Sequence, residues 1–159
     1  MGMPTPAGGE TGELAQAVGR VFETTLGLQA GIGGEDLPAC PDLMTAAVYL
    51  SGKHRGAVLI HCLPPQACAF AGRFLSSAPP HSVDDEVFDI LGELTNMVAG
   101  NLPCALLPGT VLSVPSVFEG PAAKLRVCGS HGADRTAFRT PSGPFWVTMV
   151  ATGESTRKA

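Results

Sequence analysis

The clearest pattern of apolar and polar positions in the chain lies between Asp84 and Leu102. If each residue turns the side-chain direction by about 100°, as in an α-helix, the large apolar residues of this segment share one stripe. They are Val87, Ile90, Leu91, Leu94, Val98 and Leu102. The opposite stripe carries Asp89, Glu93, Asn96 and Gly100. The segment is therefore expected to form an amphipathic helix that packs its apolar stripe against a core.

The residues that flank this segment indicate where the helix begins and ends. Ser82 is expected as the N-cap, and Asp85 three residues later would complete a capping box with Asp in the place of Glu. Pro103 lacks a backbone N–H and cannot continue a helix interior. The helix is therefore expected to stop near Asn101 or Leu102.

The other elements follow from shorter patterns. Residues 1–10 are expected to be a flexible tail, followed by a helix from Thr11 to about Leu26 that Gly27 ends. Residues 28–44 are expected to be irregular. Two runs rich in Val, Ile and Leu predict a hairpin, and the Pro-Pro pair after it predicts a short helix. The hairpin strands are expected at 45–50 and 56–63, the short helix at 66–76, and further strands at 111–118, 124–128, 135–139 and 145–151.

The order of these elements predicts the fold class. Helix, strands, helix and strands form a weak two-fold repeat, in which the segment 53–60 parallels the segment 141–147. The simplest arrangement is an α/β (α+β) fold with two long helices packed on a largely antiparallel sheet. We expect one domain over residues 11–152 and a frayed tail over 153–159.

Composition and charge exclude several classes of function. The chain has 159 residues and a formal net charge of −4, without a basic stripe, which argues against nucleic acid as the partner. No apolar run reaches the roughly 18 residues of a membrane span, and the N-terminus has no secretion signal, so a cytoplasmic protein is expected. The five cysteines include no Cys-x-x-Cys pair, so no metal site is predicted and free, partly buried thiols are expected.

Candidate chemistry is confined to the polar stripe of the predicted central helix. Glu93 and Asn96 lie one turn apart, with Gly92 and Gly100 beside them. They are either an ordinary solvated surface or a carboxylate and an amide that enter a partner's active site. An amide cannot act as a base, but it can orient a water for attack on a phosphoryl group, as glutamine does in GTPases. Because a helical glycine costs about 1 kcal/mol relative to alanine, the two glycines indicate that something approaches this face closely.

These residues also carry a resemblance to a known family. The motif Asp89-x-x-x-Glu93-x-x-Asn96 resembles the CheX-type chemotaxis phosphatases of the CheC/CheX/FliY group. The segments 56–60 before the helix and 112–120 after it also fit the family's order, and the resemblance covers roughly residues 11–152.

The resemblance implies two long helices against a sheet, with the active site on the second helix. It further implies hydrolysis of the aspartyl phosphate on a CheY-like response regulator. Asn96 would orient the attacking water and Glu93 would engage the regulator's lysine, while Asp89, Gly92 and Gly100 would contact the partner. Mg²⁺ would belong to the regulator's site, with no cofactor bound by this chain. A homodimer is expected because family members often dimerise through their sheets.

The first predicted helix carries Glu13-x-x-Gln16 instead of a Glu-x-x-Asn pair. We interpret it as ordinary surface, so a single active site is expected, as in CheX rather than CheC. Two alternatives stay open on sequence grounds. One is a non-catalytic adaptor of the same fold that binds a receiver domain or a flagellar-switch component. The other is an unrelated small α+β domain that binds a metabolite.

Overall fold

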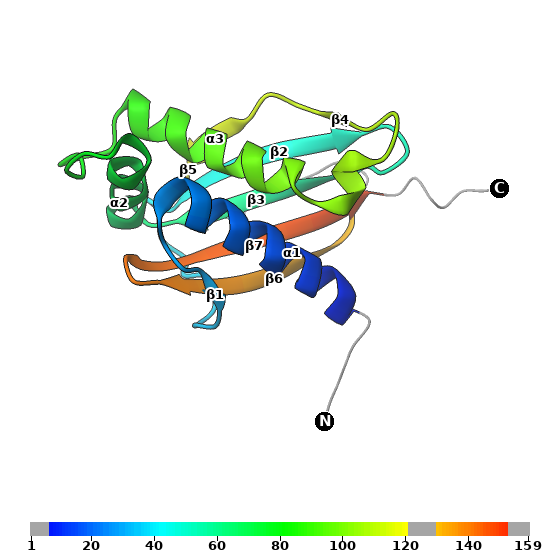
Figure 1. Ribbon diagram of the computed structural model, residues 1–159, viewed down its shortest axis with the longest axis horizontal. Coiled ribbons are helices and arrows are strands. Elements are labelled where there is room, and N and C mark those ends of the chain that lie inside the picture. Colours follow the sequence, from blue (N-terminus) through cyan, green and yellow to red (C-terminus); the bar gives the residue numbers. More distant parts are fainter. Residues whose placement is uncertain (1–6, 121–129, 153–159) are drawn as a thin grey trace.

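A computed structural model of the chain describes residues 7–120 and 130–152. Within these residues, helices cover one face of a seven-stranded antiparallel sheet (Figure 1). The helices are α1 (Ala7–Val21), which continues into the π-helical turn η1 (Phe22–Leu26), α2 (Pro64–Leu75), α3 (Asp85–Gly100) and the 3₁₀ turn η2 (Pro103–Leu106). The strands are β1 (Gly31–Ile32), β2 (Met44–Ser51), β3 (Gly56–Cys62), β4 (Val111–Leu112), β5 (Ser116–Glu119), β6 (Ser130–Thr140) and β7 (Gly143–Thr152).

The strand order shows the two-fold repeat that the sequence predicts. The order is β1-β6-β7-β3-β2-β4, with β5 also paired to β2. The hairpins β2–β3 and β6–β7 meet at the central pair β3–β7, whose register runs from Gly56 opposite Ala151 to His61 opposite Trp146. Each hairpin takes a short outer strand from the other half of the chain: β1 pairs with β6, and β5 pairs with β2. The predicted fold class is confirmed.

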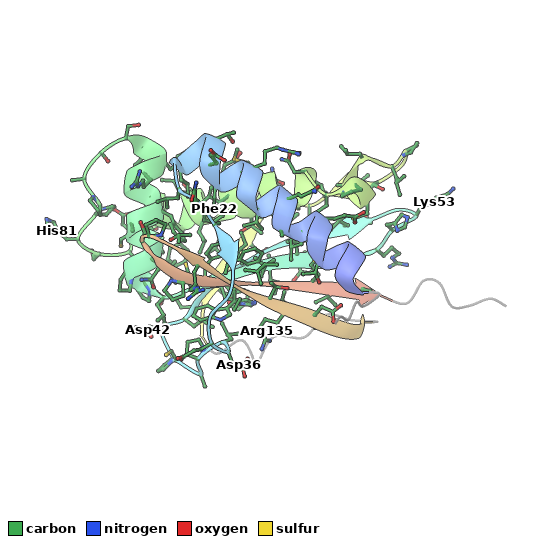
Figure 2. All side chains as sticks on the ribbon, turned by 60° about the horizontal axis from the view of Figure 1, so that its bottom comes forward. Phe22, Asp36, Asp42, Lys53, His81 and Arg135 are labelled. Atoms are coloured by element: carbon green, nitrogen blue, oxygen red, sulfur yellow. The ribbon has the colours of Figure 1, made fainter. Side chains whose placement is uncertain are left out.

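The core lies between the helices and the sheet, and it contains a cluster of four buried phenylalanines. The rings of Phe22 and Phe145 stack with centroids 4.5 Å apart, and Phe70 meets both rings edge-on. Phe138 stacks on the other side of Phe145 at 5.2 Å. Figure 2 shows Phe22 on the helix-covered side of the sheet, with Arg135 on the opposite side. These contacts join η1, α2 and the β6–β7 hairpin, so helix and sheet positions depend on each other.

The sequence predicted the C-terminal end of α3 correctly but not its N-cap. The helix ends at Gly100 with Asn101 as its C-cap, as expected from Pro103. At the other end Asp84 is the N-cap, because its Oδ1 accepts a hydrogen bond of 3.0 Å from the backbone N–H of Val87. The predicted N-cap, Ser82, is therefore wrong by two residues.

Other boundaries show smaller differences from the sequence-based expectations. The helix α1 begins at Ala7, inside the segment expected to be a tail, and β1 forms within the stretch expected to be irregular. The strand expected at 111–118 is divided into β4 and β5, with Pro115 in the gap. The strand expected at 124–128 lies outside the described residues. Across the described part of the chain, no helix has the length and apolar character needed to span a membrane.

Candidate active site

The helix α3 places its apolar stripe in the core and its polar stripe outside, as predicted. Val87, Leu94 and Val98 are fully buried. On the other side of the helix, Glu93 is exposed and Asn96 is half-buried. Because the two residues are three apart, they lie one helical turn from each other on the same surface. Asp89, one turn before Glu93, is also exposed.

The side chains of this pair make no polar interaction with the described part of the chain. Within residues 7–120 and 130–152, no hydrogen bond or ion pair forms to the side chain of Glu93 or of Asn96. Neighbouring polar groups on α3 are used internally. The Thr95 hydroxyl donates to the carbonyl of Leu91 at 2.8 Å, and the Asn101 carboxamide donates to the carbonyl of Met97 at 2.8 Å. The carboxylate and the amide of the candidate pair are thus available to a partner molecule.

The two glycines beside the pair are approached by the end of β4 and by the segment that joins β4 to β5. Gly92, Asn96 and Gly100 are spaced by four residues and form one ridge of the helix. A Cβ atom at position 92 would lie 3.1 Å from the Cβ of Pro115, and one at position 100 would lie 3.8 Å from Cδ1 of Leu112. Gly92 is buried, and its missing side chain makes room for Pro115. Contact of Gly92 with a partner stays a prediction.

Glu13 and Gln16 occupy the corresponding place on α1 and are both exposed. Each pair has the same spacing relative to the buried stripe of its helix. Leu14 and Val18 of α1 are buried, as are Leu94 and Val98 of α3. The structure therefore provides an internal counterpart of the candidate pair, with glutamine in the place of asparagine.

A second polar cluster crosses the face of the sheet that the helices leave open, and sequence reasoning missed it. The Nδ1 atom of His61 lies 2.8 Å from the Thr45 hydroxyl, and its Nε2 atom lies 2.8 Å from the Thr148 hydroxyl. Arg135 donates from Nε to the same Thr148 oxygen at 3.2 Å. Burial, and secondarily the Arg135 charge, lower the pKa of His61 to about 4. The pairing of Thr45 with His61 across the predicted hairpin was the signal available in the sequence.

The cysteines of the described residues behave as the sequence indicates. Cys62 and Cys68 are buried, and burial, then the nearby Cys68 thiol, raises the pKa of Cys62 to about 12. Within residues 7–120 and 130–152, no cluster of three or more His, Cys, Asp or Glu side chains could hold a metal ion.

Comparison with known families identifies the family to which this chain belongs. A family model described as "Chemotaxis phosphatase CheX" matches residues 44–138, which is more than half of the chain. The chain belongs to the CheX family. The matched region contains all of α3 and therefore every predicted site residue. The alternative of an unrelated metabolite-binding domain is wrong.

Solved CheX structures share the fold of this chain. CheX from Vibrio vulnificus has a TM-score of 0.72 at 19% identity, over 88% of this chain and 94% of that one. CheX from Desulfovibrio desulfuricans has a TM-score of 0.68 at 23% identity, over 89% and 97%. The CheX of a CheX–CheY–BeF₃–Mg²⁺ complex from Borrelia burgdorferi has a TM-score of 0.69 at 19% identity, over 90% and 97%. No curated protein sequence matches the chain.

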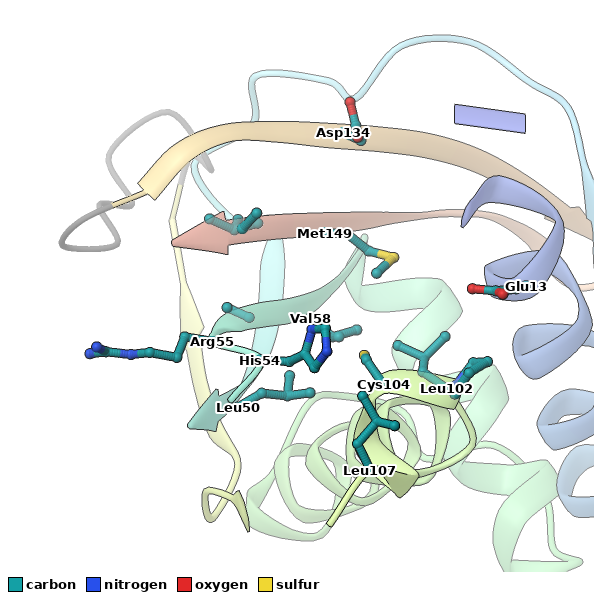
Figure 3. Close-up of a pocket in the computed structure, with 15 residues that line it drawn as sticks. Glu13, Leu50, His54, Arg55, Val58, Leu102, Cys104, Leu107, Asp134 and Met149 are labelled. Carbon is teal, nitrogen blue, oxygen red and sulfur yellow. The ribbon is translucent and has the colours of Figure 1, made fainter. Parts of the chain in front are cut away.

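In this CheX-family chain, an apolar cavity of about 430 Å³ opens at the C-terminal end of α3 (Figure 3). Leu102 and Cys104 line it from the end of the helix, Val58 and Met149 line it from the sheet, and Glu13 lies at its α1 side. Neither Glu93 nor Asn96 contributes to it. The candidate pair is therefore on an outward-facing helix surface and not inside this cavity.

Proposed function

We propose that this protein hydrolyses the aspartyl phosphate of a CheY-like receiver domain in the cytoplasm. Asn96 orients the attacking water, and Glu93 engages the lysine of the receiver's active site. The water oxygen bonds to phosphorus as the bond to the aspartate oxygen breaks, which leaves a free carboxylate and inorganic phosphate. Mg²⁺ is supplied by the receiver.

One observation carries the proposal: α3 presents an exposed carboxylate and a half-exposed amide one turn apart, both without partners in the described chain. A rigid helix limits how far the amide can move relative to the carboxylate. When Glu93 pairs with a lysine, Asn96 is therefore placed at a set distance from the phosphoryl group. An amide that already served as a helix cap, as Asn101 does, would not be available for this task.

The alternative of a non-catalytic adaptor predicts that Asn96 is covered or that its replacement has no effect. The half-exposed position of Asn96 supports catalysis over this alternative. The Borrelia burgdorferi complex pairs a CheX with a CheY, which supports a receiver domain as the substrate. The expected homodimer belongs to this proposal too, and sedimentation of the purified chain tests it.

The test is the decay of phosphorylated CheY-like receivers from the same cell, with Mg²⁺ present. Wild-type protein should accelerate decay, and Asn96→Ala should lose roughly a hundredfold of that acceleration, because the water is no longer held in line. Glu93→Ala should weaken binding of the phosphorylated receiver as well as slow turnover.

Gln16→Ala is the matched control, since it removes an exposed amide from the corresponding position of α1. It should retain the wild-type rate. Decay at the wild-type rate with Asn96→Ala would remove this residue from the mechanism. No acceleration by the wild type with any receiver would favour the adaptor.

A further inference from the structure

The segment that joins β4 to β5 runs beside the ridge of α3 that contains Asn96. Leu112 lies next to Gly100 and Pro115 lies next to Gly92, so the segment is antiparallel to the helix. Eight residues of helix span about 12 Å, and the three steps from residue 112 to residue 115 span about 10 Å in extended form. Residues 113 and 114 therefore lie at the level of Asn96. In Figure 1 this segment runs along the upper edge of α3, on the side away from α1.

Ser113 holds this segment to the edge of the sheet. Its backbone N–H donates to the carbonyl of Tyr49 at 2.8 Å, and its Oγ accepts the N–H of Tyr49 at 2.9 Å. Pro115 is held on its other side by contact with the helix at Gly92. The residue between these two attachments, Val114, is therefore presented on a segment that is fixed at both ends.

Val114 is 83% exposed, the highest fraction among the large apolar side chains of the described residues. A single exposed valine needs no explanation by itself. Val114, however, lies on a segment that is fixed at both ends, and it lies at the level of Asn96. Asn96 carries the only side-chain amide of α3 that faces outward without a partner among the described residues. An apolar side chain in that place contributes binding free energy only if the molecule that reaches Asn96 also covers it.

We propose that Val114 is an apolar docking contact for the receiver domain, beside its phosphorylated aspartate. This inference rests on the proposed function. It extends that function to a residue that discriminates a phosphorylated receiver domain from a small-molecule acyl phosphate. The occupant is a protein because Glu93, Asn96 and Val114 lie on an outward-facing surface. The described cavities of about 430, 760 and 420 Å³ are lined by other residues. A small acyl phosphate would meet only the two polar side chains, whereas a receiver can cover Val114 too.

The experiment separates binding from turnover in Val114→Ser, Val114→Leu and Ile32→Ser. Ile32 is the matched control because it is also a β-branched aliphatic residue, 52% exposed, on β1 at the opposite edge of the sheet. Rates of phosphate release are measured against receiver concentration, with Mg²⁺ present. Val114→Ser should raise KM roughly tenfold with kcat unchanged, because about one valine side chain of buried apolar area is lost. Val114→Leu and Ile32→Ser should keep the wild-type KM.

The dissociation constant for a receiver loaded with beryllium fluoride and Mg²⁺ gives an independent measurement. It should rise by the same factor in Val114→Ser. If the wild type binds the beryllium fluoride-loaded receiver but does not accelerate phosphate release from the phosphorylated receiver, the proposed function fails, while weaker binding of Val114→Ser would still support the docking contact. Equal KM and dissociation constants for Val114→Ser and wild type would overturn the docking contact alone. A changed oligomeric state of Val114→Ser, with unchanged receiver binding, would assign the residue to contact with a second copy and also overturn it.

Discussion

Gly92 and Pro115 pack against each other directly, so that a Cβ atom at position 92 would lie 3.1 Å from the Cβ of Pro115. This contact brings the end of the divided edge strand onto the helix that carries Glu93 and Asn96. The helix surface beside the candidate pair is thus bounded by a second segment of the chain, and the position of that segment depends on a missing side chain.

The contact predicts opposite effects for two glycine-to-alanine substitutions on the same ridge. Gly92→Ala should lower the free energy of unfolding by about 1 kcal/mol, because crowding against the Pro115 ring outweighs the gain in helix propensity. Gly100→Ala should raise the free energy of unfolding by about 0.5 kcal/mol, because alanine has the higher helix propensity and its Cβ would lie at an ordinary contact distance from Leu112. Urea denaturation of both variants measures the difference. Equal stabilisation by both would show that the segment at Pro115 moves away freely.

The N-cap of α3 predicts a second pair of variants. Asp84→Ala should lower the free energy of unfolding by about 1 kcal/mol, since the N–H of Val87 then loses its side-chain acceptor. Ser82→Ala should change it by less than about 0.5 kcal/mol, as expected for an exposed residue outside the helix. Thermal unfolding of both variants is the measurement. A larger loss of unfolding free energy with Ser82→Ala than with Asp84→Ala would show that Ser82 is the N-cap, as the sequence predicted.

The buried His61 predicts a loss of stability in mild acid. Its pKa is lowered from 6.5 to about 4 in the folded chain, so the unfolded chain binds the proton more readily. Stability should therefore fall as the pH falls from 6.5 to about 4, by roughly 3 kcal/mol in total. Denaturant titrations at several pH values, compared with His61→Gln, measure this contribution.

His81 is the control for this prediction because its side chain is exposed. His81→Gln should keep the wild-type dependence on pH, while His61→Gln should flatten it between pH 6.5 and 4. Parallel profiles for all three proteins would mean that His61 does not carry the loss.

The buried thiols predict an order of chemical modification. Cys62 is fully buried with its pKa raised to about 12, so almost no thiolate is present at neutral pH. Cys40 is half-exposed and should react with a thiol reagent before Cys62, which should react only after unfolding. Peptide mapping by mass spectrometry at increasing urea concentration follows both residues. Early modification of Cys62 in the native protein would show that the end of β3 opens locally.

The elements that the sequence predicted well are those with a strong local pattern. Val87, Leu94 and Val98 are buried as the helical period requires, and Glu93 and Asn96 face outward for the same reason. The β2–β3 hairpin also appears within about one residue of its expected bounds. In each case the direction of a side chain depends on its own backbone conformation and on neighbours a few residues away.

The N-cap of α3 was misplaced because several residues near the helix start could serve as caps. Ser82, Asp84 and Asp85 all have side-chain oxygens that can accept a hydrogen bond. The choice depends on which residue adopts an extended backbone as the chain enters the helix, and Asp84 does so at φ −130° and ψ −173°. The path of the preceding segment decides this conformation, and propensity does not describe it.

By itself, the sequence determined the helix that carries the candidate site, the outward direction of its carboxylate and amide, and the helix–strand order behind the fold class. Local backbone geometry suffices for all three. Only the tertiary structure decided that Gly92 meets Pro115, that Val114 lies at the level of Asn96, and that His61 is enclosed by Thr45 and Thr148. These contacts join residues far apart in the chain, and they exist only after the sheet and helices have packed together.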